Sequence, residues 1–153
     1  TGNASFEAEA PPWEKWDSAQ LTEHRLVARE GDCVLAWTAL SPVSARCVYS
    51  GVAELSLYVA AANRSKGIGS TLIKAVIDST EKAGLWTLQG GIFPENTPSL
   101  RLVKKYDFKE VGRREKIGKM TYGDLPGIWR DVVLVERRST VAGKESTIPQ
   151  QGC

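Results

Sequence analysis

The chain has 153 residues, of which 42% are apolar and 25% are charged, and its formal net charge is +2. This composition supports one folded domain and excludes a largely disordered chain, and the balanced charge excludes a broad surface for nucleic acid or anionic membranes. No apolar run approaches the roughly 20 residues of a membrane helix, and the opening TGNASFEAEAPPWEKW lacks the basic and apolar regions of a signal peptide.

The N-terminal half of the sequence predicts one helix and three strands. The helix covers residues 12–21, with Pro12 suited to its start. Two strands at 24–29 and 33–40 are joined by a tight turn at Gly31 and Asp32. Residues 41–50 form a loop before a third strand at 51–60.

The C-terminal half predicts two helices and three strands, at 67–83, 85–92, 97–106, 108–116 and 128–137. The first of these helices carries one apolar stripe, made by Ile68, Leu72, Ile73, Val76 and Ile77. The last two strands are joined by a loop at 118–127. With no repeat and no linker, the sequence predicts a single α+β domain over residues 1–138 with a largely antiparallel sheet, followed by a disordered polar tail at 139–153.

The three cysteines, Cys33, Cys47 and Cys153, are odd in number and are not closely paired in the sequence. This pattern predicts free thiols in a reducing compartment. Together with the lack of a signal peptide or membrane helix, it predicts a cytoplasmic protein with neither a membrane nor a nucleic-acid partner.

A glycine-containing turn, Arg64-x-x-Gly67-x-Gly69, opens the long helix after a strand. Glycines let the backbone approach a ligand closely, and a helix N-terminus offers unpaired amides and the positive end of the helix dipole. The turn therefore fits a pyrophosphate, although glycines at a helix start also serve tight packing alone. The spacing matches neither a P-loop nor a dinucleotide-binding fingerprint.

The strand before this turn places a carboxylate on one of its faces. Strict alternation puts Val52, Glu54, Ser56 and Tyr58 together. Glu54 is then either solvent-facing on a half-exposed strand or a partly desolvated general base beside the glycine turn.

Other catalytic schemes lack the necessary residues. His24 is the only histidine and is expected to be structural or exposed, so neither a Ser-His-Asp triad nor a zinc site with close-spaced ligands is predicted. Asn96 is predicted to cap the second helix, with a ligand-binding amide as the alternative. Arg46 is either a solvated charge or a clamp for a substrate carboxylate.

Four segments, AELSLYV, RSKGIGSTL, ENTPSLRL and IWRDVVLVERRS, resemble the GNAT acetyltransferases, and within them the phosphinothricin acetyltransferase branch that includes amino-acid N-acyltransferases. The resemblance extends from Thr1 to about Ser139. It implies a GNAT-like α+β fold, acetyl-CoA as co-substrate without a metal, and a homodimer. It also implies transfer of the acetyl group to the primary amine of a small amino-acid-like acceptor, of the phosphinothricin or methionine-derivative type.

The resemblance also assigns roles to individual residues. Glu54 matches the carboxylate taken as the general base, and Asn96 matches an asparagine near the cofactor. The strand that pairs with the pantetheine arm is matched by Leu57, Tyr58 and Val59. The pyrophosphate loop is matched by Ser65, Lys66, Gly67, Ile68, Gly69 and Ser70. The substrate loop is matched by Ala45, Arg46 and Cys47.

The sequence departs from the family pattern in three places. Val103 stands where many GNAT enzymes carry the tyrosine that protonates the leaving thiolate, and Asp107 replaces a usual glycine. The family's first strand and first helix would precede Thr1, which leaves one side of the sheet or pocket uncovered. Two alternatives stay open: an acetyltransferase for another amine (peptide, protein or aminoglycoside), and a non-catalytic acyl-CoA sensor.

Overall fold

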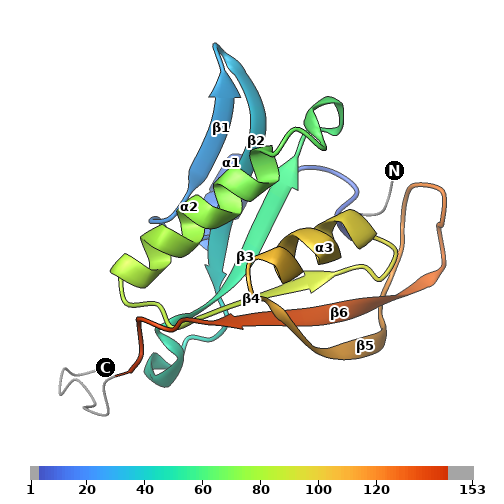
Figure 1. The fold of residues 1–153 in the computed structure, drawn as a ribbon. Coiled ribbons are helices and arrows are strands. Elements are labelled where there is room, and N and C mark those ends of the chain that lie inside the picture. Colours follow the sequence, from blue (N-terminus) through green and yellow to red (C-terminus); the bar gives the residue numbers. More distant parts are fainter. Residues whose placement is uncertain (1–3, 145–153) are drawn as a thin grey trace.

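The computed structural model describes residues 4–144, which form a six-stranded sheet with α-helices on both faces (Figure 1). The strands run in the spatial order β1-β2-β3-β4-β6-β5. The elements in chain order are α1 (Trp13–Ala19), β1 (Leu26–Glu30), β2 (Cys33–Pro42), β3 (Val52–Val59), α2 (Ile68–Lys82), β4 (Thr87–Ile92), α3 (Thr97–Lys105), β5 (Lys109–Lys119) and β6 (Trp129–Arg138). Short 3-10 turns occur at Cys47–Tyr49 and Ala61–Asn63.

The sheet is antiparallel except at its centre, where β3 and β4 run parallel. The parallel pairing is short: it joins Val52 to Thr87 and ends where Glu54 meets Gln89. Beyond this point the two strands separate, because no further β3–β4 pair forms in the described residues. This separation creates the cavity described below.

The core lies between the sheet and α2. The apolar stripe of α2 is buried at Leu72, Ile73, Val76 and Ile77, as its helical spacing predicts. Of these, Ile73, Val76 and Ile77 belong to a cluster with apolar residues of the central strands, namely Leu40, Ala53, Leu88, Val133 and Val135, and with Phe108. Because α2 packs on the side of β3 that carries Ala53, the alternate residues Glu54, Ser56 and Tyr58 belong to the opposite face.

That opposite face is covered by α1 and a row of aromatic rings. Tyr58 of β3 stacks on Trp37 of β2, with ring centroids 4.9 Å apart. Trp37 meets Trp16 of α1 edge to face at 5.6 Å, and Trp16 stacks on Trp13 at 5.2 Å. Aromatic contacts therefore attach α1 to the sheet, and Figure 1 shows α1 behind the sheet with α2 and α3 in front.

The histidine and the described cysteines of the chain lie in different surroundings. His24 is structural: its side chain is 7% exposed and its Nδ1 lies 2.8 Å from the Ser79 hydroxyl of α2. Cys33 is a free, exposed thiol. The free-thiol prediction is wrong for Cys47, which is disulfide-bonded, and Cys153 lies outside the described residues.

The described start of the C-terminal tail is anchored. The Ser139 amide donates to the Trp86 carbonyl at 2.8 Å, and its hydroxyl donates to Glu81 at 2.8 Å. Residues 145–153, which complete the predicted tail, are outside the described range. Within residues 4–144, no helix has the length and apolar character needed to cross a membrane.

Candidate active site

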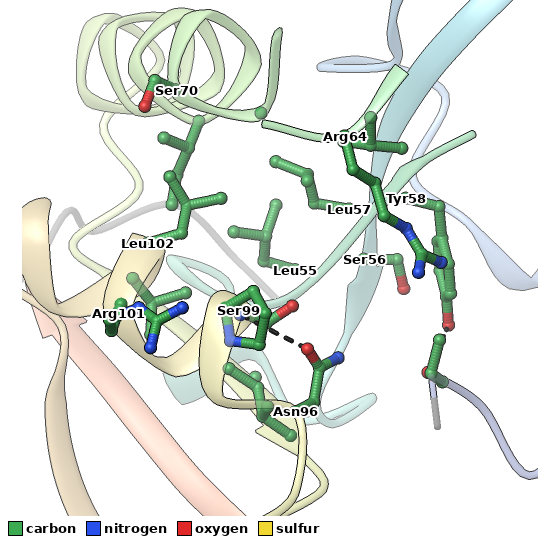
Figure 2. Close-up of a pocket in the computed structure, with 18 of the residues that line it drawn as sticks. Leu55, Ser56, Leu57, Tyr58, Arg64, Ser70, Asn96, Ser99, Arg101 and Leu102 are labelled. Carbon is green, nitrogen blue, oxygen red and sulfur yellow. Dashed lines mark hydrogen bonds between the residues drawn. The ribbon is translucent and has the colours of Figure 1, made fainter. Parts of the chain in front are cut away.

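A cavity of about 530 Å³ opens where β3 and β4 separate. Its walls come from β3, the turn before α2, the first turn of α2, the end of β4, and α3 (Figure 2). All but four of the predicted site residues line it; the exceptions are Lys66, Ala45, Arg46 and Cys47.

The separated edge of β3 leaves backbone groups facing the cavity. The Leu55 carbonyl oxygen lies 3.6 Å from an ideal Cβ position on Gly90 of β4, so it faces β4. Because backbone groups alternate in direction along a strand, those of Leu57 and Val59 face the same gap, whereas those of Tyr58 face β2. Unpaired backbone groups need partners, so Leu57 and Val59 offer hydrogen bonds to an extended ligand.

The turn before α2 combines left-handed backbone with an uncapped helix start. Gly67 caps α2 with φ of +81°, a conformation that favours glycine, and Ser65 has φ of 61°. No side chain caps α2 and no acidic residue lies in its first turn. The first amides of the helix are therefore available to an anion, which the helix dipole also favours.

The two glycines of the turn, Gly67 and Gly69, have different surroundings. An added Cβ on Gly67 would meet nothing within 4 Å, so this position is open toward a ligand. An added Cβ on Gly69 would lie 3.1 Å from Leu102 of α3 and 3.6 Å from Val59. Gly69 therefore serves helix packing, which is one of the two explanations that the sequence leaves open.

Glu54 marks the point where the strands separate. Its carboxylate accepts a hydrogen bond from the Gln89 side chain at 3.2 Å, and the residue is exposed. The expectation that it is partly desolvated is therefore wrong, because the edge of the cavity is open to water at this point. Exposure still leaves the carboxylate accessible to a bound amine or to a bridging water.

Tyr58, on the same face as Glu54, occupies a drier place. Burial raises the pKa of the Tyr58 phenol, and the negative charges of Glu7 and Glu54 raise this pKa further. A hydrogen bond with Ser5 lowers the pKa and offsets part of the increase. The phenol is therefore neutral around pH 7. The tyrosine ring forms one wall of the cavity beside Ser56 (Figure 2).

Asn96 caps α3 at the opposite wall of the cavity. Its side-chain oxygen accepts a hydrogen bond from the Ser99 amide at 3.3 Å (Figure 2). The predicted cap is thus confirmed. Since the cap uses the oxygen, the amide nitrogen is the group that can donate to a ligand, and both roles are compatible.

The predicted substrate loop lies away from this cavity. Ala45, Arg46 and Cys47 are exposed in the connection between β2 and β3. The Arg46 guanidinium lies 5.8 Å from the ring centroid of Tyr49, a cation–π contact at the surface. The Lys66 ammonium points to the Asn63 side chain, 3.1 Å away, and Lys66 does not line the cavity.

Two cationic side chains line the cavity although the sequence does not single them out as site residues. Arg64 lies on the side of Ser56 and Tyr58, and Arg101 lies on α3 (Figure 2). Arg64 is the first residue of the glycine motif, so the motif could have indicated it as a site residue. Nothing in the sequence indicates Arg101 as a site residue, because an arginine on a short polar helix is ordinarily a solvated charge.

Comparison with known proteins agrees with this geometry. Residues 3–108 match the model of the acetyltransferase (GNAT) family. The chain belongs to the GNAT acetyltransferase family. The predicted GNAT-like fold, a mixed six-stranded sheet flanked by three helices, is confirmed.

Individual GNAT relatives extend the match. The chain is 32% identical over 108 residues to YwnH of Bacillus subtilis (strain 168), which is named provisionally as a phosphinothricin acetyltransferase. The matched region covers 69% of this chain and 66% of YwnH. It is 30% identical over 108 residues to phosphinothricin N-acetyltransferase of Streptomyces coelicolor, with 71% and 60% covered. The chain thus spans less than two thirds of the length of these curated relatives.

A solved GNAT structure agrees over most of the described fold. The phosphinothricin acetyltransferase of Sinorhizobium meliloti, solved in complex with acetyl-CoA, superposes with a TM-score of 0.79 at 22% identity. The superposition covers 97% of this chain and 80% of that one. It therefore includes the β5–β6 hairpin, which the family model does not reach.

Two departures from the GNAT pattern have structural consequences. Val103 lines the cavity, so an apolar side chain faces it where many GNAT enzymes have a tyrosine. Asp107 has φ of 64°, a left-handed conformation in which glycine is free of strain and aspartate is among the better-tolerated residues. This backbone geometry is compatible with the glycine that the family resemblance implies at this position.

Proposed function

We propose that the protein is an N-acetyltransferase that moves the acetyl group of acetyl-CoA to the primary amine of a small amino-acid-like acceptor. One observation carries this proposal. Glu54, the unpaired edge of β3 and the uncapped start of α2 succeed one another along the chain and line the same cavity. Membership of the GNAT family and the names of the relatives support it.

The residues present fit acetyl-CoA. A pyrophosphate would be held by the amides of the turn, residues 65–70, and the pantetheine arm would pair with Leu57 and Val59. Arg101, on α3, adds positive charge beside a ligand that carries phosphates. These groups form the cofactor side of the cavity, which faces α2 and α3.

The acceptor side is the sheet face that carries Glu54, Ser56 and Tyr58. Glu54 would take a proton from the acceptor ammonium, directly or through water, so that the free amine can attack the thioester carbonyl. A backbone amide near Leu57 would polarise that carbonyl. The new amide bond forms as the carbon–sulfur bond breaks, the nitrogen releases its surplus proton to solvent, and coenzyme A leaves as a thiolate.

Protonation of that thiolate needs no dedicated acid. A free thiol has a pKa of about 8.5, so the thiolate is a stable leaving group close to neutral pH. This is consistent with Val103 at the family's tyrosine position. Holding both reactants in one cavity supplies a large part of the acceleration.

The acceptor class is the finer part of the proposal. Phosphinothricin and methionine derivatives such as methionine sulfoximine carry an α-amine beside a carboxylate. Arg46, which does not line the cavity, is the residue that the family resemblance assigns to that carboxylate. A different amine, such as a peptide, a protein or an aminoglycoside, is the rival acceptor. The carboxylate of Glu54, which lines the cavity, favours a cationic acceptor of that kind.

The deciding experiment is a coenzyme A release assay with a thiol reagent. The acceptor panel would contain phosphinothricin, methionine sulfoximine, unmodified amino acids, a peptide with a free N-terminus and an aminoglycoside. Turnover with the first two alone supports the proposal. Acetyl-CoA binding by calorimetry without turnover on any acceptor would instead identify an acyl-CoA sensor.

The homodimer expected from the family resemblance belongs to the same proposal. Light scattering on the purified chain at several concentrations measures its mass directly. A mass near twice the 16.7 kDa of the chain would support a homodimer, and a mass equal to one chain would contradict it.

A further inference from the structure

The N-terminal strap, residues 4–7, runs across the acceptor side of the cavity. Ala4 lines the cavity, and its carbonyl accepts a weak hydrogen bond from the Tyr58 hydroxyl at 3.5 Å. The next carbonyl, that of Ser5, accepts a stronger one from the Tyr122 hydroxyl at 2.7 Å. The strap therefore bridges β3 and the loop between β5 and β6.

Phe6 fixes this strap by its ring. The ring meets Phe93, which follows β4, edge to face with centroids 4.8 Å apart. Phe93 is 5% exposed and lines the cavity, and the Arg130 guanidinium lies 4.2 Å from its ring centroid. Arg130 is in turn bound to Glu95 at 2.8 Å. Phe6 is thus attached to a buried, hydrogen-bonded wall.

The strand β5 leaves space for the Phe6 ring at a single glycine. An ideal Cβ on Gly118 would lie 2.5 Å from Phe6 Cε1 and 2.6 Å from Cζ, well inside van der Waals contact. Gly112, on the same strand, has no atom within 4 Å of its Cβ position. Only the glycine at 118 is therefore required by the strap.

We propose that the strap is the outer wall of the acceptor side, and that Phe6, seated on Gly118 and Phe93, is the residue that positions it. This inference rests on the proposed acetyltransferase function. The strap places the carbonyl of Ala4 at the Tyr58 hydroxyl, on the face of Glu54. Acceptor-side oxygens of this kind attract an ammonium group, so the strap selects for the amine and narrows its approach.

The test compares Gly118→Ala with the matched variant Gly112→Ala. Displacing Phe6 should raise KM for the acceptor about tenfold, with acetyl-CoA affinity within about twofold, because the strap contacts described above involve neither the glycine turn nor α2. Gly112→Ala should change neither value. Phe6→Ala removes the same contact without touching β5, and it serves if Gly118→Ala does not fold.

A second readout does not depend on turnover. Tyr58 is half-buried, its hydroxyl contacts the strap at Ala4, and burial raises the pKa of its phenol. In Gly118→Ala the pKa should move down toward the ordinary tyrosine value, as measured by ultraviolet titration with Tyr58→Phe to identify the signal. Gly112→Ala should titrate like the unaltered protein.

The outcomes separate this inference from the proposed function. If the unaltered protein acetylates an acceptor but Gly118→Ala and Phe6→Ala leave KM unchanged, the strap is not a wall of the acceptor site. An unchanged Tyr58 titration in both variants would show that Phe6 does not position the strap. If the unaltered protein binds acetyl-CoA and acetylates nothing, the proposed function fails, and the role of the strap toward an acceptor fails with it.

Discussion

At the cofactor side of the cavity the walls come mainly from one unbroken stretch, in which β3 leads through the glycine turn into α2. At the acceptor side they come from segments far apart in sequence. The hydrogen bond between Tyr122 and Ser5, for example, joins residues 117 positions apart. A local motif thus builds one side, whereas tertiary contacts assemble the other.

This difference determines what substitutions should do. On the cofactor side, one backbone position controls several amides at once, so one change should weaken binding strongly. On the acceptor side, each segment contributes one or two contacts, so the losses should be smaller and specific to the acceptor. Glu54 is the exception, because in the proposed mechanism it acts on the reacting amine itself.

The largest effect is expected at Glu54. Glu54→Gln keeps the shape of the side chain and removes its basicity, so kcat should fall by about 10²–10⁴-fold while acetyl-CoA affinity barely changes. Raising the pH should recover part of the loss, since free amine then forms without a base. Steady-state kinetics from pH 7 to 9.5 and calorimetry measure both effects.

A control for this variant comes from its hydrogen-bond partner. Gln89→Ala removes the contact at 3.2 Å but leaves the carboxylate in place, so kcat should fall by no more than a few-fold. Near-full kcat in Glu54→Gln at pH 7 would show that the carboxylate has a structural role, and the base would have to be sought elsewhere.

The next effect concerns the glycine turn. Gly67→Val should weaken acetyl-CoA binding more than tenfold, because a branched side chain there occupies the space open to a ligand and opposes the left-handed backbone. Gly84 has almost the same φ, 85° against 81°, and the same open surroundings, at the far end of α2.

Gly84→Val should therefore introduce the same backbone strain at a position that is far from the proposed ligand site. Thermal unfolding should show similar destabilisation in both variants, and calorimetry should show lost acetyl-CoA affinity only in Gly67→Val. Equal acetyl-CoA affinity in the two variants would show that the turn does not bind the cofactor. The two sides of the cavity would then not differ in the way described above.

Most of the fold could be predicted from the sequence because its elements carry local signals. The stripe of α2 gave a helix, and Gly31 with Asp32 gave a two-residue turn, since Glu30 pairs with Cys33 across it. The separation of β3 from β4 had no such signal. It depends on pairing that stops at Gln89, which no pattern in either strand reveals.

The candidate site followed the same division. Residues of the turn and of β3 were predicted because motif and alternation place them together. The contribution of Phe6, Phe93 and Gly118 was missed, since only the folded chain brings them into contact. The expected desolvation of Glu54 failed for a related reason: burial depends on neighbours that alternation along one strand does not specify.

A smaller effect is expected at Asn96, where cap and ligand contact can be separated. Asn96→Asp keeps an oxygen for the Ser99 amide and loses the amide donor, so stability should hold while acetyl-CoA affinity falls a few-fold. Asn96→Ala loses both, with about 1 kcal/mol of stability. Urea unfolding and calorimetry distinguish them, and unchanged affinity in both variants would restrict Asn96 to capping.

The smallest effect is expected at Arg46, which tests how the acceptor side is assembled. Arg46 is exposed and does not line the cavity, so an ion pair with an acceptor carboxylate would be strongly screened by solvent. Such exposed pairs contribute up to about 1 kcal/mol, which corresponds to about fivefold in KM. Arg46→Ala should therefore raise KM for phosphinothricin by up to about fivefold and leave acetyl-CoA affinity intact.

The comparison that decides this prediction uses an acceptor without the carboxylate and an arginine elsewhere. KM for the decarboxylated analogue should be the same in Arg46→Ala as in the unaltered protein, because the guanidinium then has no partner to lose. Arg29→Ala, at another exposed position on the edge strand β1, controls for the change in net charge. Equal increases with both acceptors would mean that Arg46 supports the loop through its contact with Tyr49. The carboxylate would then be recognised by another segment of the acceptor side.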